Sequence, residues 1–379
     1  MRHHLYNRNF SFVKEPESFD KYTERELLQY CLGATMYMPG TKDITSKLLD
    51  GKLAGLTSFV MCFEDACPKE KINEAEKNVH NMLDKLTAAI DEGKLSSDNL
   101  PLVFVRVRNI GQFDDFAAQL TKHQLRCLCG IVFPKFSAAN GRLYFEKLRE
   151  LNYKFSENLY GMPIIENTEV AYKETRISEL LGIKIVLDSY RSLVLQIRVG
   201  GTDFSSVFGV RRGVDYSIYD IMTVRDCLCD IINIFGRNND YVISGPVWEY
   251  FRAPKELMFD ELPSHGLDDY LMKRLPIVNQ EIDGLLREVI LDKANGFVGR
   301  TVIHPTHIKY VNALNAVTKE EYEDAVMILG NTEGGVVKGT GSNKMNEIRP
   351  HTNWASKIYN RARAFGVIEN EGSYIKLFA

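Results

Sequence analysis

Several features that would indicate a membrane or an extracellular location are missing from this sequence. No apolar run approaches the roughly 18 uninterrupted residues of a membrane-spanning helix, and residues 1–6 lack the apolar run of a signal peptide. The seven cysteines include the C-x-C pairs Cys127/Cys129 and Cys227/Cys229 but no C-x-x-C motif, so their spacing does not indicate a zinc site. We therefore expect a cytoplasmic protein whose cysteines are mostly buried, reduced thiols.

Blocks of like charge and internal repeats are also missing. Lys and Arg number 47 against 50 Asp and Glu, which gives a net charge of -3, and neither sign is concentrated in one segment. A nucleic-acid-binding arm or a polybasic membrane patch would need such a block. We therefore expect neither nucleic acid nor a membrane as a partner.

What the sequence does contain is a regular alternation of short apolar runs with amphipathic, charge-rich segments. This pattern is typical of βα units around a parallel sheet, and eight parallel strands close most naturally into a (β/α)8 TIM barrel. The predicted strands are 34–40, 58–66, 102–109, 130–135, 162–167, 193–203, 241–247 and 300–305.

Three segments fall outside the barrel pattern. They are an N-terminal leader of about 30 residues, an insertion at 251–271 before the eighth strand, and the tail that follows the barrel. In the tail, the glycine-rich tract 334–341 precedes an amphipathic segment at 353–365. We expect the leader and barrel to occupy residues 1–330, and a hinge with a docking or lid arm to occupy residues 331–379.

Polar side chains close most of the apolar runs. In TIM barrels the active site lies at the carboxyl ends of the strands, so these side chains are candidates for function. They are Glu64, Asp65, Arg106, Lys135, Glu166, Asn167, Asp203 and His304.

Two of these carboxylates suit a hard divalent cation. Glu166 and Asp203 end neighbouring strands, and Mg²⁺ favours a few carboxylates with open positions for water or substrate oxygens. Arg106 would hold a substrate carboxylate through two donors. The alternatives are that Glu166 and Asp203 are solvated or cap helices, and that Arg106 forms a structural ion pair with Glu64 or Asp65.

Seven motifs occur in an order that resembles the citrate lyase β-subunit and malyl-CoA lyase family, within the HpcH/HpaI aldolase superfamily. The similarity covers roughly residues 34–316. The motifs are MYMPG at 36–40, FEDAC at 63–67, VRV at 105–107, GIVFPK at 130–135, PIIEN at 163–167, VGGTDF at 199–204 and GFVGRTVIHPTHI at 296–308.

This resemblance implies a carbon–carbon bond lyase that cleaves or forms a 3-hydroxy acid or its CoA-type thioester through a metal-stabilised enolate. It implies Mg²⁺ or Mn²⁺ as cofactor and a homo-oligomer, trimer or hexamer. The residue roles that it suggests are metal binding by Glu166 and Asp203, catalysis by Arg106, Glu64 and Asp65, and substrate contacts by Arg106, Pro39, Gly40, Lys42 and Asn167, with the segment 39–42 near phosphates of a CoA-like group.

The tail carries one more candidate. CoA-ester lyases of the family bring a carboxyl-terminal Asp over a neighbouring subunit's site, and the nearest match here, Met345-Asn346-Glu347, makes Glu347 a candidate acid/base. The alternative is that the tail packs on its own barrel. The leader, the insertion and the tail resemble a divergent bacterial branch of C–C bond lyases encoded near tellurium-resistance and stress genes.

Three further residues near the strand ends have alternative roles. His304 and His307, around Pro305, are expected to cap and orient the last barrel helix rather than bind metal. Lys135 is not expected to form a Schiff base, because the metal motifs favour the other mechanism. Two further functions stay open: a class II aldolase acting on a free 2-oxo acid, and a non-catalytic metal- or ligand-binding component of a stress-response system.

Overall fold

Seven parallel strands curl around one another in the computed structural model, which describes residues 1–53, 55–252, 267–331, 334–339, 341 and 345–378. Their order in the sheet is β6-β5-β4-β3-β2-β1-β7, so strands that follow one another in sequence are neighbours up to β6. The bounds are β1 (Ala34–Pro39), β2 (Ser58–Cys62), β3 (Leu102–Arg106), β4 (Leu128–Phe133), β5 (Tyr160–Ile165), β6 (Arg198–Val199) and β7 (Arg300–Val302).

The predicted strand at 241–247 closes the barrel through two isolated bridges. Ile243 pairs with Ile197 next to β6, and Gly245 pairs with Arg300 of β7, both in parallel. The segment is irregular because Pro246 has no N–H to donate and Gly245 packs directly against Asp292, whose Oδ2 would lie 2.4 Å from a Cβ at that position. The prediction of an eight-stranded TIM barrel is confirmed, with its seventh strand reduced to these bridges.

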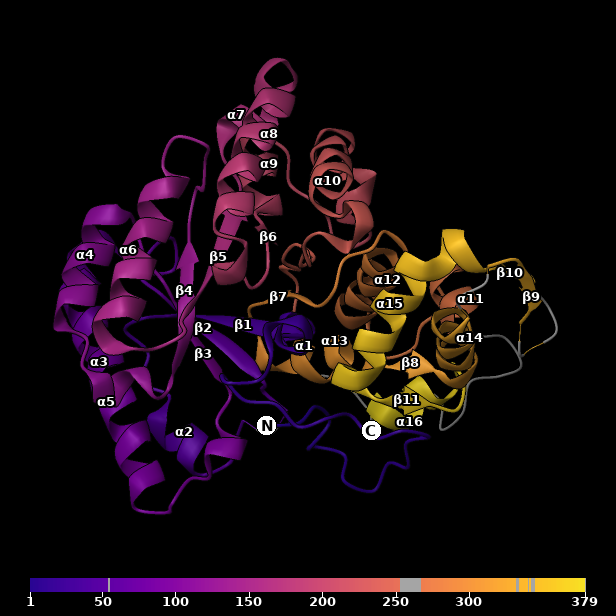
Figure 1. Cartoon of the computed structure of the whole chain (residues 1–379), viewed down its shortest axis with the longest axis horizontal. Helices are drawn as coiled ribbons and strands as arrows, with labels where there is room; N and C mark the ends of the chain where they lie inside the picture. Colours follow the sequence, from indigo (N-terminus) through magenta and orange to yellow (C-terminus); the bar gives the residue numbers. More distant parts are fainter. Residues whose placement is uncertain (54, 253–266, 332–333, 340, 342–344, 379) are drawn as a thin grey trace.

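Helices surround the strands, as Figure 1 shows, with α3, α4 and α6 at one end of the molecule and α14 and α15 at the other. No described helix combines the length and the apolar composition needed to cross a bilayer. The longer helices of the barrel are α3 (Ile72–Asp91), α4 (Ile110–Gln119), α6 (Gly141–Phe155), α8 (Lys173–Ser189), α10 (Met222–Phe235), α12 (Gln280–Ala294), α13 (Ile308–Asn315) and α14 (Lys319–Gly330).

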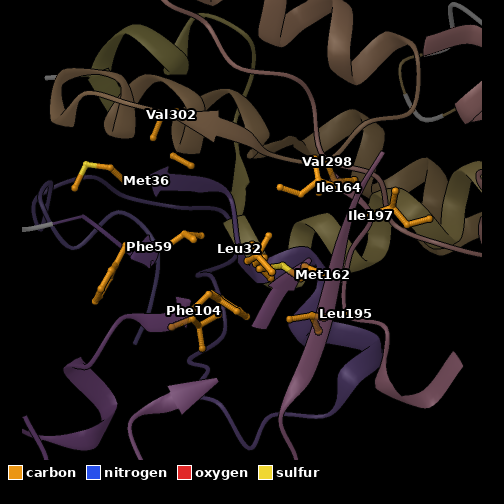
Figure 2. Close-up of a cluster of buried hydrophobic side chains, with 14 of the residues drawn as sticks. Leu32, Met36, Phe59, Phe104, Met162, Ile164, Leu195, Ile197, Val298 and Val302 are labelled. Carbon is orange, nitrogen blue, oxygen red and sulfur yellow. The ribbon is translucent and has the colours of Figure 1, made fainter. Parts of the chain in front are cut away.

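The barrel strands are buried on both faces, as expected where helices cover a parallel sheet. Figure 2 shows part of the resulting core, with Met36, Phe59, Phe104, Met162 and Val302 contributed by five different strands. Because the core fills the barrel, polar side chains reach solvent chiefly where the strands end. Those ends therefore position the site.

The tail packs on its own chain. Helix α15 (Ile348–Phe365) lies along α14, and the short strand β11 (Val367–Ile368) pairs with β8 (Val317–Thr318). Ile358 and Ala362 of α15 share a satellite core with Ala325 and Ile328 of α14. This core contains residues from both sides of the domain boundary predicted at residue 330. The division of the chain at that boundary stays a prediction.

The predicted hinge and insertion differ in part from expectation. Within the tract 334–341, β9 (Val336–Lys338) forms an antiparallel pair with β10 (Met345–Glu347), so part of the predicted hinge is a strand. Of the insertion at 251–271, residues 253–266 lie outside the described residues, and α11 (Leu267–Met272) begins directly after them.

The leader ties the two ends of the chain together. Val13 N donates to Val367 O at 2.8 Å, and Glu17 N donates to Arg363 O at 2.7 Å. The buried His4 ring places Nε2 3.0 Å from Phe365 O, at the end of α15. Leader, α15 and barrel therefore form one packed body.

His4 should make stability depend on pH. Burial lowers the pKa of His4 from 6.5 to about 4, opposed in part by the contact with Phe365 O. Well above pH 6.5 His4 is neutral in both the folded and the unfolded chain. As the pH falls below 6.5, His4 binds a proton in the unfolded chain but stays neutral in the folded chain. The free energy of unfolding should therefore fall by roughly 3 kcal/mol by pH 4.

Thermal unfolding from pH 7.5 to pH 4 checks this expectation. His4→Asn retains a donor but cannot titrate, so its midpoint should fall less steeply with pH than that of the unmodified protein. Parallel slopes for the two proteins would show that His4 does not contribute.

Candidate active site

The carboxyl ends of β2, β3, β5 and β6 bring the predicted charged residues together. Glu64 and Asp65 follow β2, Arg106 ends β3, and Glu166 follows β5 directly. Asp203 lies slightly beyond its strand, in the first turn of α9 (Gly201–Val207). Asp65, Arg106, Glu166 and Asp203 line one pocket of about 430 Å³.

Arg106 is the centre of the charge cluster. Its Nη2 lies 2.6 Å from Glu64 Oε2, 3.2 Å from Asp65 Oδ2 and 3.0 Å from Glu166 Oε1. Burial alone would lower the pKa of Arg106, but Glu166 and Glu64 raise it above the ordinary value. The alternative of a structural ion pair with Glu64 or Asp65 is confirmed, and Arg106 Nε has no hydrogen-bond partner among the described residues.

The two carboxylates after β2 have different surroundings. Glu64 is buried and accepts from Arg106, from Lys135 Nζ at 2.8 Å and from Asp65 N at 2.9 Å. The Asp65 side chain is 59% exposed toward the pocket. Burial raises the pKa of Asp65, but the Glu64 contact, Arg106 and Lys135 outweigh it and lower the pKa. The next helical turn begins after Pro68, and neither carboxylate caps it.

Lys135 helps to fix this arrangement from the end of β4. Its backbone is left-handed, with φ 44°, a conformation uncommon outside glycine. In this conformation Lys135 N donates to Glu166 Oε1 at 2.9 Å, while Nζ reaches Glu64. The strained residue therefore links two of the site carboxylates.

Glu166 and Asp203 lie close enough to influence each other's ionisation. Burial, together with Asp203, raises the pKa of Glu166 to about 7, although Arg106 opposes the shift. Burial, together with Asp65, raises the pKa of Asp203. A Cβ on Gly200 would lie 2.4 Å from Glu166 Cβ and 3.1 Å from Asp203 Oδ2, so glycine lets both carboxylates pack against its backbone, and both line the pocket. Two close carboxylates beside an open space suit a bound cation.

The charge count of the cluster also fits a divalent cation. Four carboxylates face two cations, which leaves two negative charges when all six groups are ionised. In the described part of the chain no three His, Cys, Asp or Glu side chains are placed to share one metal ion. The pair Glu166 and Asp203 is thus a donor set for a hard cation that completes its shell with water or substrate oxygens. The six groups are Glu64, Asp65, Glu166, Asp203, Arg106 and Lys135.

A family model described as a C–C bond lyase of the TIM-barrel fold matches residues 26–367. The chain belongs to this family of C–C bond lyases. The predicted family is confirmed. The predicted activity of a carbon–carbon lyase is confirmed at the level of the family. The predicted relation to tellurium-resistance genes stays a prediction.

Individual relatives agree with this membership. A segment of 97 residues is 32% identical to citrate lyase subunit beta of Leuconostoc mesenteroides subsp. cremoris, and it covers 25% of this chain and 32% of that protein. The match thus spans about a third of the relative's length.

Two solved structures share the fold. CitE from Mycobacterium tuberculosis, in complex with magnesium, acetoacetate and coenzyme A, is 15% identical with a TM-score of 0.51, over 88% of this chain and 99% of that chain. Haloferax volcanii malate synthase is 11% identical with a TM-score of 0.52, over 79% of this chain and 78% of that one. At these identities the likeness supports the barrel fold alone.

The remaining substrate candidates of this C–C bond lyase lie around the pocket rather than in it. Gly40 O accepts from Asn78 Nδ2 at 2.7 Å, and Lys42 is exposed at the first strand end. Pro39, Gly40 and Lys42 are not among the residues that line the pocket. Asn167 borders an adjoining pocket of about 510 Å³, which Glu166 and Asp203 also line. The substrate contacts of all four stay predictions.

Glu347 lies apart from the charge cluster of its own chain. It is exposed and occupies the N-cap position of α15, which packs on α14. It does not line the pocket, so it does not complete the site within one chain. The alternative that the tail packs on its own barrel is confirmed for α15, and a role of Glu347 in a neighbouring subunit stays a prediction.

The histidines near the last barrel helix act as expected. His304 accepts from Thr306 N and caps a short turn, with Pro305 at its first position. His307 Nε2 lies 3.1 Å from Tyr250 O. The prediction of a capping and orienting role is confirmed for His304, and His307 holds a backbone carbonyl.

Three residues of the pocket were not foreseen from the sequence. Tyr37 of β1, Arg198 of β6 and Thr301 of β7 also line it. Arg198 Nη2 donates to Thr301 Oγ1 at 2.6 Å, and its guanidinium lies 5.6 Å from the Tyr37 ring centre. The signal that would have revealed Arg198 is a basic residue inside an apolar run, two positions before Gly200.

Proposed function

We propose that this protein is a Mg²⁺- or Mn²⁺-dependent carbon–carbon bond lyase that cleaves or forms a 3-hydroxy acid or its CoA-type thioester. The observation that carries the proposal is that Glu166 and Asp203 pack against Gly200 and line the same pocket, with Arg106 in contact with Glu166. Membership of the C–C bond lyase family supports it. The proposal includes a cytoplasmic homo-oligomer, trimer or hexamer, in which Glu347 acts in a neighbouring subunit.

The side chains of the pocket divide the chemistry among them. A cation held by Glu166 and Asp203 would supply a Lewis acid for substrate oxygens. Arg106, held by three carboxylates with its Nε unpaired, donates to a substrate carboxylate. Asp65 is ionised at neutral pH and faces the pocket, so it accepts the proton of the substrate hydroxyl as the carbon–carbon bond breaks.

The remaining electron and proton transfers take place on the substrate. The bonding electron pair stays with the fragment next to the carboxylate or thioester carbonyl, and that fragment takes up one proton before it leaves. Glu64 is a positioning residue, because its contacts to Arg106 and Lys135 fix the groups that meet the substrate.

One observation favours a second candidate, a class II aldolase that acts on a free 2-oxo acid. The segment proposed to contact a CoA-like group, Pro39 to Lys42, does not line the pocket. A pocket of about 430 Å³ is sufficient for a small acid. The two candidates share the metal site and differ in whether the substrate carries a thioester arm.

Turnover assays with and without EDTA test the function. Purified protein is given a free 3-hydroxy acid, its CoA thioester, or a 2-oxo acid with an aldehyde, each with Mg²⁺, and the products are separated by chromatography. We expect metal-dependent cleavage or condensation with at least one set, at rates that EDTA abolishes. Binding of Mg²⁺ without any turnover across the sets would favour a non-catalytic, ligand-binding component instead.

A further inference from the structure

Arg198 differs from every other charged group of the pocket because it has no partner of opposite charge. Only 1% of the residue is exposed, and no carboxylate of the described residues lies within 4 Å of its guanidinium. Its partners are neutral: Nη1 contacts Thr35 Oγ1 at 3.2 Å and Gln196 Oε1 at 2.9 Å, and Nη2 donates to Thr301 Oγ1 at 2.6 Å. Arginine does not lose its proton in proteins, so the charge is present.

A buried cation without a counter-charge is costly. Removing an ion from water costs several times more than neutral hydrogen bonds return, so buried charges in proteins are paired with few exceptions. Arg300 shows the ordinary arrangement in this chain: it is fully buried and pairs with Glu288 at 2.6 Å and Asp292 at 3.4 Å. The fold thus balances one buried arginine and leaves the other unbalanced.

Unused hydrogen-bond donors converge at the same place. Tyr37 Oη, Arg106 Nε and Arg198 Nε are all buried and have no hydrogen-bond partner in the part of the chain that the structure describes, and all three residues line the pocket. Arg106 is already neutralised by Glu64, Asp65 and Glu166, whereas Arg198 is not. A ligand that offers acceptor oxygens and a negative charge would satisfy all three donors.

We infer that Arg198, with Tyr37 and Thr301, forms a subsite for a second carboxylate of the substrate, deep in the pocket and separate from the metal carboxylates. The inference rests on the proposed function and specifies its substrate class, a hydroxy acid with two carboxylate groups. Arg198 supplies the charge, and the bonds of Nη1 and Nη2 to the strand hydroxyls of β1 and β7 fix its plane. The carboxylate supplies the counter-charge that the fold leaves out.

Two acids that differ by one carboxylate test the subsite. Malate and lactate both carry a hydroxyl next to a carboxylate, and malate adds a second carboxylate. In calorimetric titrations of the Mg²⁺-loaded protein, we expect malate to bind more tightly than lactate. Arg198→Met should weaken malate binding roughly a hundredfold and leave lactate binding nearly unchanged, because it removes only the contact to the second carboxylate.

Stability measurements separate this role from that of a structural strut. Arg198→Met removes an unbalanced buried charge, so the ligand-free variant should unfold at the same temperature as the unmodified protein or above it. Arg300→Met is the matched control: it removes one of the two arginines that pair with Glu288 and the arginine that pairs with Asp292, and it should lower the midpoint. Arg198→Lys keeps the charge without the planar fork and should retain part of the preference for malate.

The outcomes are distinct. Equal preference for malate in the unmodified protein and in Arg198→Met would overturn the subsite, and so would a midpoint for Arg198→Met as low as that of Arg300→Met with the preference intact. If lactate and malate bind equally well to the unmodified protein in a Mg²⁺-dependent manner, the subsite fails while the proposed function stands. If neither acid shows Mg²⁺-dependent binding, the proposed function fails first.

Discussion

The Glu166→Ala/Asp203→Ala variant is expected to lose measurable Mg²⁺ binding and to turn over substrate at least about a thousandfold more slowly than the unmodified protein. Both carboxylates line the pocket, and they are the pair that fits a hard cation there. Without them, Glu64 and Asp65 only balance the charges of Arg106 and Lys135, so the net negative charge that would attract the metal is lost. Calorimetric titration with MgCl₂ and steady-state assays measure the two effects.

A control must remove the same charge elsewhere. Glu174→Ala/Asp226→Ala deletes two exposed carboxylates on α8 and α10, outside the pocket, and should leave metal binding and turnover unchanged. Both variants should remain folded, as judged by circular dichroism. Undiminished Mg²⁺ affinity in the Glu166→Ala/Asp203→Ala variant would exclude this pair as the metal site.

The barrel could be predicted from the sequence because its signal is repetitive. Buried parallel strands are short apolar runs, and the helices between them are amphipathic, so the pattern recurs along the chain. The carboxyl ends of such strands meet at one face, which is why Glu64, Arg106 and Glu166 could be grouped from their positions in the sequence. The strand at 241–247 is weaker than predicted because Gly245 and Pro246 interrupt its hydrogen bonding, although both residues are visible in the sequence.

The pairing of charges could not be predicted in the same way. The sequence places Arg106, Glu64 and Lys135 at strand ends, but side-chain rotamers decide which carboxylate each cation contacts. Arg198 was missed because a parallel strand is buried on both faces, so its sequence does not show which side chains point into the barrel. Alternating polar and apolar residues reveal which side chains face the core only in a strand that has one face exposed to solvent.

The tail shows a similar limit. The amphipathic helix was foreseeable, since Ile358 and Ala362 lie four residues apart on one face. Its partner was not, because an apolar stripe fits a helix of the same chain or of a neighbouring subunit equally well. In the structure that stripe packs on Ala325 and Ile328 of α14.

The largest effect on stability is expected from Glu288, which lies outside the site. Glu288 is fully buried on α12 and accepts from Arg212, from Ile218 N at 2.5 Å and from Arg300 at 2.6 Å. Glu288→Gln keeps the shape but removes the charge shared by two buried arginines. Breaking a buried ion pair in this way should lower the free energy of unfolding by about 3–5 kcal/mol.

Calorimetry of the ligand-free protein at neutral pH measures the change as a fall in the unfolding midpoint. Glu150→Gln is the matched control, because its side chain is 71% exposed and pairs only with Lys147 at the surface, where ion pairs contribute little. Arg212 retains Glu249 and Arg300 retains Asp292 in Glu288→Gln, so the variant should fold and keep its pocket. A midpoint equal to that of Glu150→Gln would mean that the two arginines are balanced by those remaining carboxylates alone, and that Glu288 acts only as a hydrogen-bond acceptor.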